Sequence, residues 1–275
     1  MNEMLIKGGT IIDGTGKAPF RADLLIEDGR IASVEQVGNP STALRTGLPN
    51  VPTLDASNLV ITPGFIDIHG HSDFTLLVDP RAVSSITQGV TTEVVGNCGH
   101  GCAPIRNKEA VKSNIYGYRA DHPLDWQSVG EYLECLKQAR PAVNVATLVP
   151  NGNLRLAVAG LVDRPSTSDE LILMKDLLLQ GLDEGAFGYS TGLEYGPEKA
   201  CTEEEITELA RVTRGKDGIY ATHTRNRAGQ ASETIAEAIR TSAASKAPLQ
   251  ISHISSVARL SEDGRWAGRA GHRAS

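Results

Sequence analysis

The chain has 275 residues, of which 40% are hydrophobic and 22% are charged, values typical of a globular protein with one large domain or one domain plus a small one. Its net charge of −6, from 27 basic and 33 acidic residues, disfavours nucleic acid as the main partner. No apolar run approaches the roughly 20 residues of a transmembrane helix, and the N-terminus does not resemble a signal peptide. Four cysteines in so long a chain do not form a disulfide scaffold, so we expect a cytoplasmic protein with reduced thiols and no membrane partner.

The first part of the chain has the pattern of a small β-domain. Short runs rich in Ile, Leu and Val predict strands at residues 4–7, 10–13, 22–27 and 30–34. Gly-Gly and Asp-Gly pairs separate them, and Asp28-Gly29 between two apolar runs is a strong hairpin signal. We therefore expect residues 1–58 to form a β-domain and residues 59–275 to form a second domain.

The second part alternates apolar strands with amphipathic helices. The predicted strands are residues 60–69, 92–97, 143–149, 187–190, 219–224 and 249–254, and the predicted helices are 128–138, 168–183, 203–214 and 230–244. Ser128 with Glu131, and Thr202 with Glu205, are spaced as capping boxes at helix starts. Such alternation predicts a parallel sheet, either doubly wound or a (β/α)8 barrel of which two strands are not found.

The densest chemical signal follows the first of these strands. His69 and His71 are two residues apart, and side chains alternate along a strand, so both imidazoles should point the same way and could grip one metal ion. Asp67 lies on the same face and could accept a hydrogen bond behind the ligands. The alternative is that these histidines are ordinary loop residues.

Further donors stand at the ends of later strands. His223 and His253 close the fifth and sixth predicted strands, and Cys98 follows the second. Because parallel strands end at one edge of a sheet, a shared site would explain all of them. Cys98 could instead form a small zinc knuckle with His100 and Cys102, although that spacing lacks a second cysteine pair, or it could be a buried free thiol.

Several motifs resemble the amidohydrolase superfamily. PGFIDIHGH (residues 63–71) is similar to its first-strand signature, and GGTIIDGTG (8–16) and DGRI (28–31) to its β-sandwich. Four more motifs resemble the narrower N-acyl-D-amino-acid deacylase (D-aminoacylase) branch: GNCG (96–99), GYSTGLEY (188–195), THTR (222–225) and ISH (251–253). The resemblance covers residues 4–255. It implies an α/β fold, an incomplete TIM-like (β/α)8 barrel with about six β/α units and a small N-terminal β-sandwich part.

The resemblance also implies a ligand set for zinc (Zn2+). In the family, His69 and His71 would hold one metal position, whereas His223 and His253 would complete a second, tighter one. Cys98 would replace the carboxylated lysine that bridges the metals in other amidohydrolases. One tight zinc site is implied, and whether there is a second, weak site is left open.

The resemblance also implies roles for substrate-binding residues. Tyr195 would lie near the substrate carboxylate or the scissile carbonyl, although it could simply pack its loop. Arg225, two residues after His223, could pair with a carboxylate in a bidentate manner or form a structural ion pair.

The implied reaction is the hydrolysis of a small-molecule N-acyl-D-amino acid to a carboxylate and a free D-amino acid by metal-activated water. One alternative is a cyclic amidase such as a dihydropyrimidinase or dihydroorotase, but those enzymes carboxylate a lysine on the fourth strand, and residues 187–193 contain none. The other is a metal-binding remnant without catalysis. The sequence leaves the oligomeric state and the preferred side chain open.

Three positions depart from the family pattern. The family's catalytic aspartate lies on the eighth strand, whereas only 22 residues follow His253, and the last acidic residue, Asp263, lies in a turn pattern. We therefore assign no catalytic acid–base residue, exclude His272 as a ligand, and expect poor stability and little turnover from a C-terminally truncated chain. Asn151 stands where relatives have histidine and Ser255 where they often have lysine, which weakens inference about the preferred acyl group.

Overall fold

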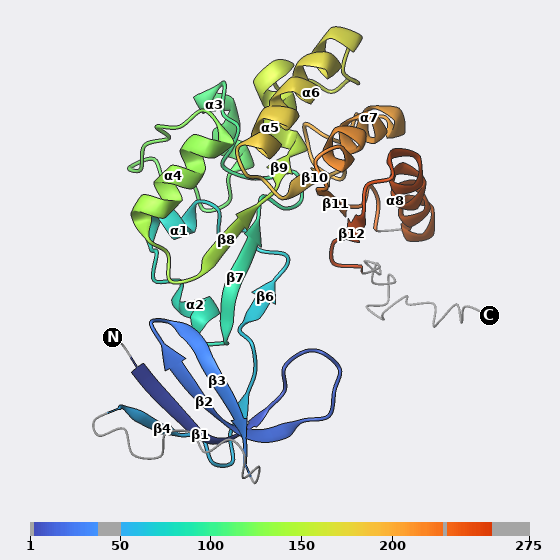
Figure 1. Cartoon of the computed structure of the whole chain (residues 1–275). Helices are drawn as coiled ribbons and strands as arrows, with labels where there is room; N and C mark the ends of the chain where they lie inside the picture. The colour runs from blue at the N-terminus through green and yellow to red at the C-terminus, as the bar shows by residue number, and fades with distance from the viewer. Residues whose placement is uncertain (1–2, 38–50, 228–229, 255–275) are drawn as a thin grey trace, which may run out of the picture. The chain divides into compact units, whose positions relative to one another are not determined.

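A computed structural model of the protein describes residues 3–37, 51–227 and 230–254. Its backbone separates into two compact units, one up to Phe65 and the other from Ile66 onward (Figure 1). The domain boundary expected after residue 58 stays a prediction. The expectations for Ser255, Asp263 and His272 concern positions outside the described residues.

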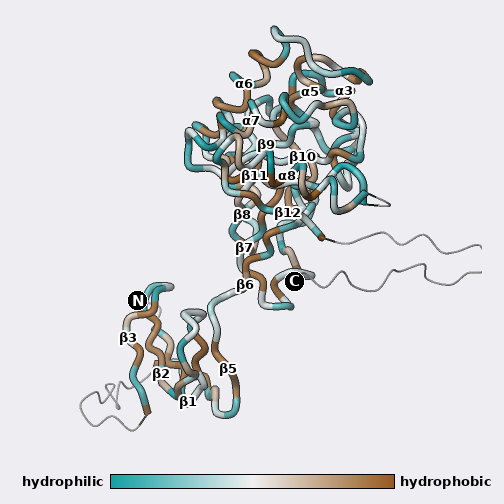
Figure 2. The backbone as a smooth tube through the Cα atoms, turned by 90° about the vertical axis from the view of Figure 1, so that its right-hand side faces the viewer, coloured by the Kyte–Doolittle hydropathy of each residue, from teal (hydrophilic) through white to brown (hydrophobic). Residues whose placement is uncertain are grey.

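The N-terminal unit is built on one five-stranded sheet. Its strands are β1 (Glu3–Ile11), β2 (Phe20–Glu27), β3 (Arg30–Gln36), β4 (Thr53–Asp55) and β5 (Val60–Ile61). The order is β3-β2-β1-β4, with β5 also paired to β1; β1, β2 and β3 are antiparallel, whereas β4 and β5 run parallel to β1. Hydrophobic residues run along these strands (Figure 2), and Ile11, Ala22 and Leu24 form their buried cluster.

The strands predicted at residues 4–7 and 10–13 form the single strand β1, whose pairing with β2 shifts register between Ile6 and Gly9. The hairpin predicted at Asp28-Gly29 is confirmed. Both residues have positive φ, 49° and 75°, which is the backbone that a tight two-residue hairpin turn requires.

The second unit contains two groups of strands. β6 (Phe65–Asp67), β7 (Val90–Val95) and β8 (Asn144–Thr147) form one sheet, and β9 (Val149–Pro150), β10 (Gly188–Gly192), β11 (Ile219–His223) and β12 (Leu249–Ile251) form another. The pairs β7–β8, β9–β10, β10–β11 and β11–β12 are parallel, as predicted. Only Leu148 separates β8 from β9, so one stretch of chain contributes to both sheets.

The single strand predicted at residues 60–69 is wrong. The chain forms β5 in the N-terminal sheet and β6 beside β7, with a break at Pro63-Gly64. Proline has no N–H to donate to a sheet ladder, and glycine weakens a strand interior, so the pair interrupts the apolar run. β6 ends at Asp67, so His69 lies after the strand instead of at its end.

The four predicted helices are present as α4 (Val129–Ala139), α6 (Ser168–Asp183), α7 (Glu203–Arg214) and α8 (Ala231–Ser245). The capping box of Ser128 and Glu131 is complete, whereas at α7 the Thr202 side chain accepts the Glu205 N–H without the reciprocal bond. The sequence did not indicate α5 (Asn151–Val158) or the short helices α1 (Thr75–Val78), α2 (Val83–Ile86), α3 (Lys108–Val111) and η1 (Lys112–Asn114). No helix in the described ranges is long and apolar enough to cross a bilayer.

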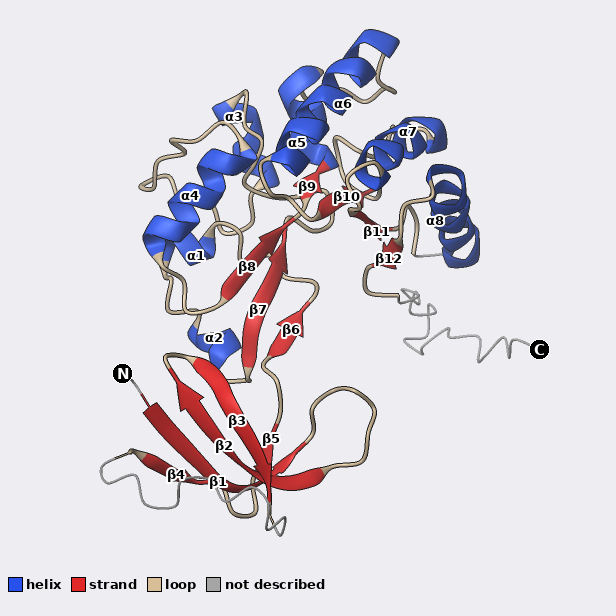
Figure 3. Cartoon of the chain, in the orientation of Figure 1, coloured by secondary structure: helices blue, strands red, loops and turns tan. Residues whose placement is uncertain are grey.

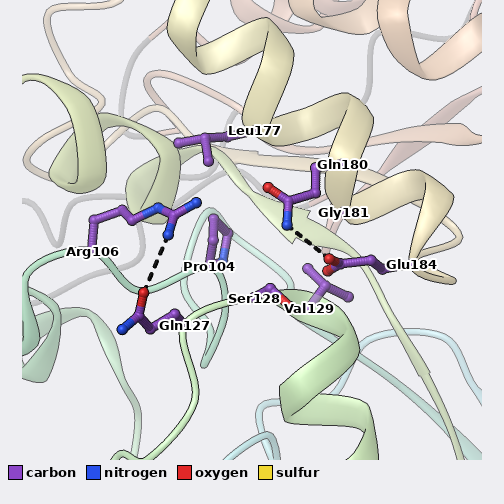
Figure 4. A pocket seen from close by; sticks show the side chains of 9 residues that line it. All are labelled: Pro104, Arg106, Gln127, Ser128, Val129, Leu177, Gln180, Gly181 and Glu184. Atoms are coloured by element: carbon purple, nitrogen blue, oxygen red, sulfur yellow. Dashed lines mark hydrogen bonds between the residues drawn. The ribbon is translucent and has the colours of Figure 1, made fainter.

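The longer helices pack beside the strands that they connect (Figure 3), and the buried residues between them form one hydrophobic cluster. Gly181 on α6 makes the contact with α4 possible, because a methyl group there would lie 3.0 Å from Val129 and 2.8 Å from Val149. In the same contact, the Glu184 carboxylate accepts the N–H of Gly130 at 2.8 Å and so satisfies an otherwise unpaired amide in the first turn of α4. Figure 4 shows Glu184 near Val129 and Gly181, with its carboxylate bonded to the Gln180 side chain.

The start of α6 gives a pH-dependent contribution to stability. Glu170 closes the capping box with Thr167 and bonds Arg164 at 2.7 Å, and this Arg164 contact lowers the pKa of Glu170 to about 2. A depressed carboxylate pKa stabilises the fold above the unfolded pKa near 4.5, and that stability is lost as the pH falls toward 2.

We therefore expect Glu170→Gln to lower the free energy of unfolding by about 1 kcal/mol at pH 7, because the pair is partly exposed. The difference from the unmodified protein should shrink steadily below pH 4.5. Denaturant unfolding at several pH values measures it, with Glu134→Gln, in an exposed pair with Lys137, as the control. A constant difference down to pH 2 would contradict the assignment.

Candidate metal centre

Five side chains from four segments meet in the second unit. The donor atoms of His69, His71 and Cys98 all lie within 4.8 Å of one another, and so do those of Cys98, His223 and His253. The Cys98 Sγ atom is common to both groups, at 3.3 Å from Nε2 of His69 and 3.4 Å from Nε2 of His253. The two groups expected from the sequence therefore meet at Cys98.

Parallel pairing brings these residues to one level. Gly192 at the end of β10 pairs with His223 at the end of β11, and Thr222 pairs with Ile251, so His253 follows just beyond the end of β12. Cys98 comes three residues after β7 and has a φ of 54°, which turns the chain away from the strand direction. The position of each of these donors thus follows from the residue at which its strand ends.

Burial sets the protonation of the cluster. It lowers the pKa of His71 to about 4, with His69 and His100 adding to the effect, and lowers the pKa of His223 to about 4. It also lowers the pKa values of His69 and His253. All four imidazoles are therefore neutral near pH 7, the form that binds metal. Burial raises the pKa of the Cys98 thiol to about 12, so a metal ion must displace its proton.

Glu194 and Arg227 form an ion pair behind the cluster, and each contacts one of its histidines. Glu194 Oε2 contacts Nε2 of His223 at 2.9 Å, which leaves Nδ1 as the nitrogen for the cluster, and the Tyr195 hydroxyl lies 3.4 Å from that Nδ1. Arg227 donates its backbone N–H to Glu194 at 2.8 Å, and its guanidinium lies 3.2 Å from Nδ1 of His253. A carboxylate on the far nitrogen of a ligand histidine fixes the orientation of the ring.

The other predicted residues lie as follows. The Asp67 carboxylate accepts the backbone N–H of His69 at 3.1 Å, a hydrogen bond to the main chain and not to a ring nitrogen. Arg225 donates to Glu237 at 2.9 Å and to the carbonyls of Lys199 and Cys201 at 2.8 Å each, as in the structural ion pair that the sequence left open. Their roles toward metal and substrate stay predictions.

The rival zinc knuckle gains no support. Neither donor group found among the described residues includes His100 or Cys102, and Cys102 is buried in the hydrophobic cluster. His100 instead lies on the aromatic side of the site, where its ring centroid is 4.9 Å from that of Tyr116 and 5.1 Å from that of Tyr195. Tyr116 in turn lies 4.5 Å from His71.

Sequence reasoning missed four polar residues around the site. Glu194 and Arg227 are described above, and Asp73 and Glu198 are buried carboxylic acids whose pKa values burial raises to about 7. Asp73 Oδ1 accepts the N–H of Gly96 at 2.7 Å. The position of Glu194 inside GYSTGLEY was a usable signal, whereas the partners of the other three are distant in sequence.

A cavity of about 570 Å³ adjoins the cluster. Glu194 and Tyr195, which contact His223, form one side of it, and Lys199, Arg225 and Gln230 belong to its lining. Arg225 is already paired with Glu237, so the exposed Lys199 is the positive charge on this wall that can turn toward a ligand.

Parallel strands that bring imidazole and thiol donors together at their ends are typical of metal-binding α/β enzymes. The model of the amidohydrolase family matches residues 53–271. The chain belongs to the amidohydrolase family.

Individual relatives match over most of this chain. D-aminoacylase of Alcaligenes xylosoxydans xylosoxydans is 35% identical over 260 residues, which cover 91% of this chain and 50% of that protein. The solved N-acyl-D-glutamate deacylase of Bordetella bronchiseptica, in complex with zinc and a phosphonate inhibitor, is 34% identical with a TM-score of 0.78, and the match covers 90% of this chain and 50% of that one. A solved D-aminoacylase with a binuclear metal centre is 33% identical with a TM-score of 0.79, again over 90% and 50%. The chain thus spans about half the length of the curated relatives it matches.

The loop that carries Cys98 tolerates little extra volume. Gly96 has a φ of 77°, and a methyl group there would lie 2.4 Å from the Leu148 carbonyl oxygen. Gly160 has a similar φ of 75°, but nothing lies within 4 Å of the position that its methyl group would take. Comparing substitutions at Gly96 and Gly160 therefore separates the cost of the left-handed backbone from the cost of the steric contact.

We expect Gly160→Ala to destabilise the protein by about 1–2 kcal/mol, the cost of the left-handed backbone. Gly96→Ala should cost at least about 3 kcal/mol, because the carbonyl contact adds to that strain. Denaturant unfolding of both variants measures the difference. Equal losses would show that the packing around Gly96 yields easily.

Proposed function

We propose that the chain carries the zinc site of an N-acyl-D-amino-acid deacylase, which hydrolyses N-acyl-D-amino acids to a carboxylate and a free D-amino acid. The single observation that carries this proposal is the convergence of four neutral imidazoles and the Cys98 thiol at the strand ends. The similarity to deacylases that act on D-amino acids supports the choice of substrate.

The donor set fits zinc. Tetrahedral zinc, with bonds of about 2.3 Å to sulfur and 2.0–2.1 Å to nitrogen, separates a thiolate from an imidazole nitrogen by about 3.5 Å. The corresponding separations from Cys98 are 3.3 and 3.4 Å. The Nδ1 atom of His71 is also buried without a hydrogen-bond partner among the described residues. Cys98, His223 and His253 would hold the tight ion, and His69 and His71 with Cys98 a weaker one.

The fold that we propose for the second unit is an incomplete TIM-like barrel, with the first unit as part of a β-sandwich. Support comes from the parallel order of β9 to β12, the stretch of chain shared by both sheets, and the TM-scores to the solved deacylases. In such barrels the active site lies at the carboxyl ends of the strands, which is where the donors stand.

When bound, zinc supplies Lewis acidity to the amide carbonyl and to water. The residues of the chain orient the site. Glu194 accepts from the outer nitrogen of His223 and holds its ring, and Arg227 pairs with Glu194 and keeps that carboxylate in place. Tyr195, which lines the cavity and contacts His223, would donate a hydrogen bond to a substrate oxygen. Arg225 supports this wall through its bonds to Lys199 O and Cys201 O.

The function is tested by loading the chain with zinc and offering it N-acetyl-D-methionine and the L enantiomer. We expect calorimetry to detect zinc-dependent binding of the D enantiomer, and any slow amine release to come from that enantiomer alone, because the chain contains no assigned acid–base residue. Equal treatment of both enantiomers, or binding that does not depend on zinc, would contradict the proposal.

The ligand assignment predicts a loss of zinc on substitution. Cys98→Ser and His253→Asn should each lower zinc affinity by a factor of about 100 or more, since each removes one donor of the tight position. Cys135→Ser is the matched control, because Cys135 lies on α4 outside both donor groups. Competition with a chromophoric chelator measures the affinities. A Cys98→Ser variant that holds zinc like the Cys135→Ser control would exclude the thiolate as a ligand.

The cavity beside His223 predicts a role for Lys199 in binding the substrate carboxylate. Lys199→Gln should weaken the binding of N-acetyl-D-methionine about fivefold, the effect of about 1 kcal/mol for an exposed ion pair. The effect should fade at high salt because exposed charges are screened. Calorimetry at two salt concentrations checks this, with Lys108→Gln, an exposed lysine paired with Asp125, as the control. An effect that salt leaves unchanged would contradict a charge interaction.

A further inference from the structure

A buried carboxylate lies directly behind the loop that carries Cys98. Glu198 is 2% exposed, and it follows Tyr195 in the segment between β10 and α7. Its side chain is not among the donors of the cluster, and it does not line the cavity beside His223. A buried carboxylate needs hydrogen-bond donors in compensation, so its contacts are informative.

The contacts of Glu198 tie three segments together. Its Oε2 atom accepts the N–H of Gly192 at 2.9 Å, at the end of β10, and the side-chain Nδ2–H of Asn151 at 3.0 Å, at the start of α5. Its Oε1 atom fills the space beneath Gly99, where a methyl group would lie 1.5 Å from that oxygen. One carboxylate therefore packs against the residue that follows Cys98 and bonds two other elements.

The two glycines that this carboxylate contacts, Gly99 and Gly192, connect it to the donor atoms. Gly192 packs so closely on the Cys98 carbonyl that a methyl group on Gly192 would lie 2.0 Å from that oxygen. Gly192 is also followed two and three residues later by Glu194 and Tyr195, which contact the ring of His223. A shift at Glu198 would thus be transmitted to Cys98 on one side and to His223 on the other.

We propose that Glu198 is a positioning residue that sets the placement of the Cys98 thiol relative to the His223 ring, and this rests on the proposed zinc site. Asn151 takes part by donating to the carboxylate. A glutamine at residue 198 can keep one acceptor oxygen for Gly192 and Asn151, but its NH2 group would then replace the second oxygen, which also faces the backbone N–H of Gly152, so the support would be incomplete.

The test uses the chain loaded with cobalt(II), whose thiolate charge-transfer band reports the geometry around Cys98. We expect Glu198→Gln to weaken or shift this band and to lower zinc affinity up to about 10-fold, the lower end of the effect of outer hydrogen bonds at a metal site, because its bonds go to Gly192 and Asn151 and not to a ligand side chain. The control is Glu205→Gln, which removes an equally buried carboxylate from its pair with Arg155. It should lower the melting temperature and leave the band unchanged.

The outcomes separate the claims. An unchanged band and affinity in Glu198→Gln, or an equal change in Glu205→Gln, would overturn the positioning role while the zinc site stands. An unmodified chain that gives no thiolate band would overturn the zinc site and the positioning role with it. If Glu198→Gln does not fold, Asn151→Ala removes only one donor and should lower zinc affinity about threefold; affinity equal to that of the unmodified chain would again overturn the role.

Discussion

The parallel ladder β9 to β12 fixes the level at which the strands end, and the donor cluster depends on this constraint. Register, not local attraction, brings the end of β10 opposite His223 and sets His253 just beyond β12. Without a metal ion, neutral imidazoles and a protonated thiol gain little from one another, and the Cys98 thiol is costly to ionise in this buried place. The fold therefore holds the donors together in advance, and the free energy for doing so comes from the hydrophobic cluster packed around the strands and helices.

The close approach of backbones is the second condition. Gly96 lies against Leu148 O, Gly99 against the Glu198 carboxylate, and Gly192 against the Cys98 carbonyl, and none of these places has room for a side-chain carbon. Cysteine has a short side chain, so its sulfur can reach the histidines only if the main chain itself lies close to the cluster. The glycines before and after Cys98 thus allow the close backbone approach that the thiol needs to reach the histidines.

The sequence predicted the elements whose signals are local. Capping residues locate α4 and α7, and strand-end histidines with a cysteine in a Gly-rich loop indicate the donors. The break at Pro63-Gly64 was visible in the sequence but was outweighed by the apolar run on both sides of it. Helix α5 was not indicated because it begins directly after β9, with no side-chain cap at Pro150.

What the sequence could not supply was the pairing of charges across distant segments. Nothing local distinguishes Arg227, which contacts Glu194 and His253, from Arg225, which is paired with Glu237. The two arginines are two residues apart, yet one supports the histidines and the other joins the β10–α7 segment to α8. The same limit applies to Glu198, whose partners Asn151 and Gly99 are 47 and 99 residues away in the chain. In a fold assembled from parallel units, the donors can be found from strand ends, but the residues that hold them in position are decided by packing between units.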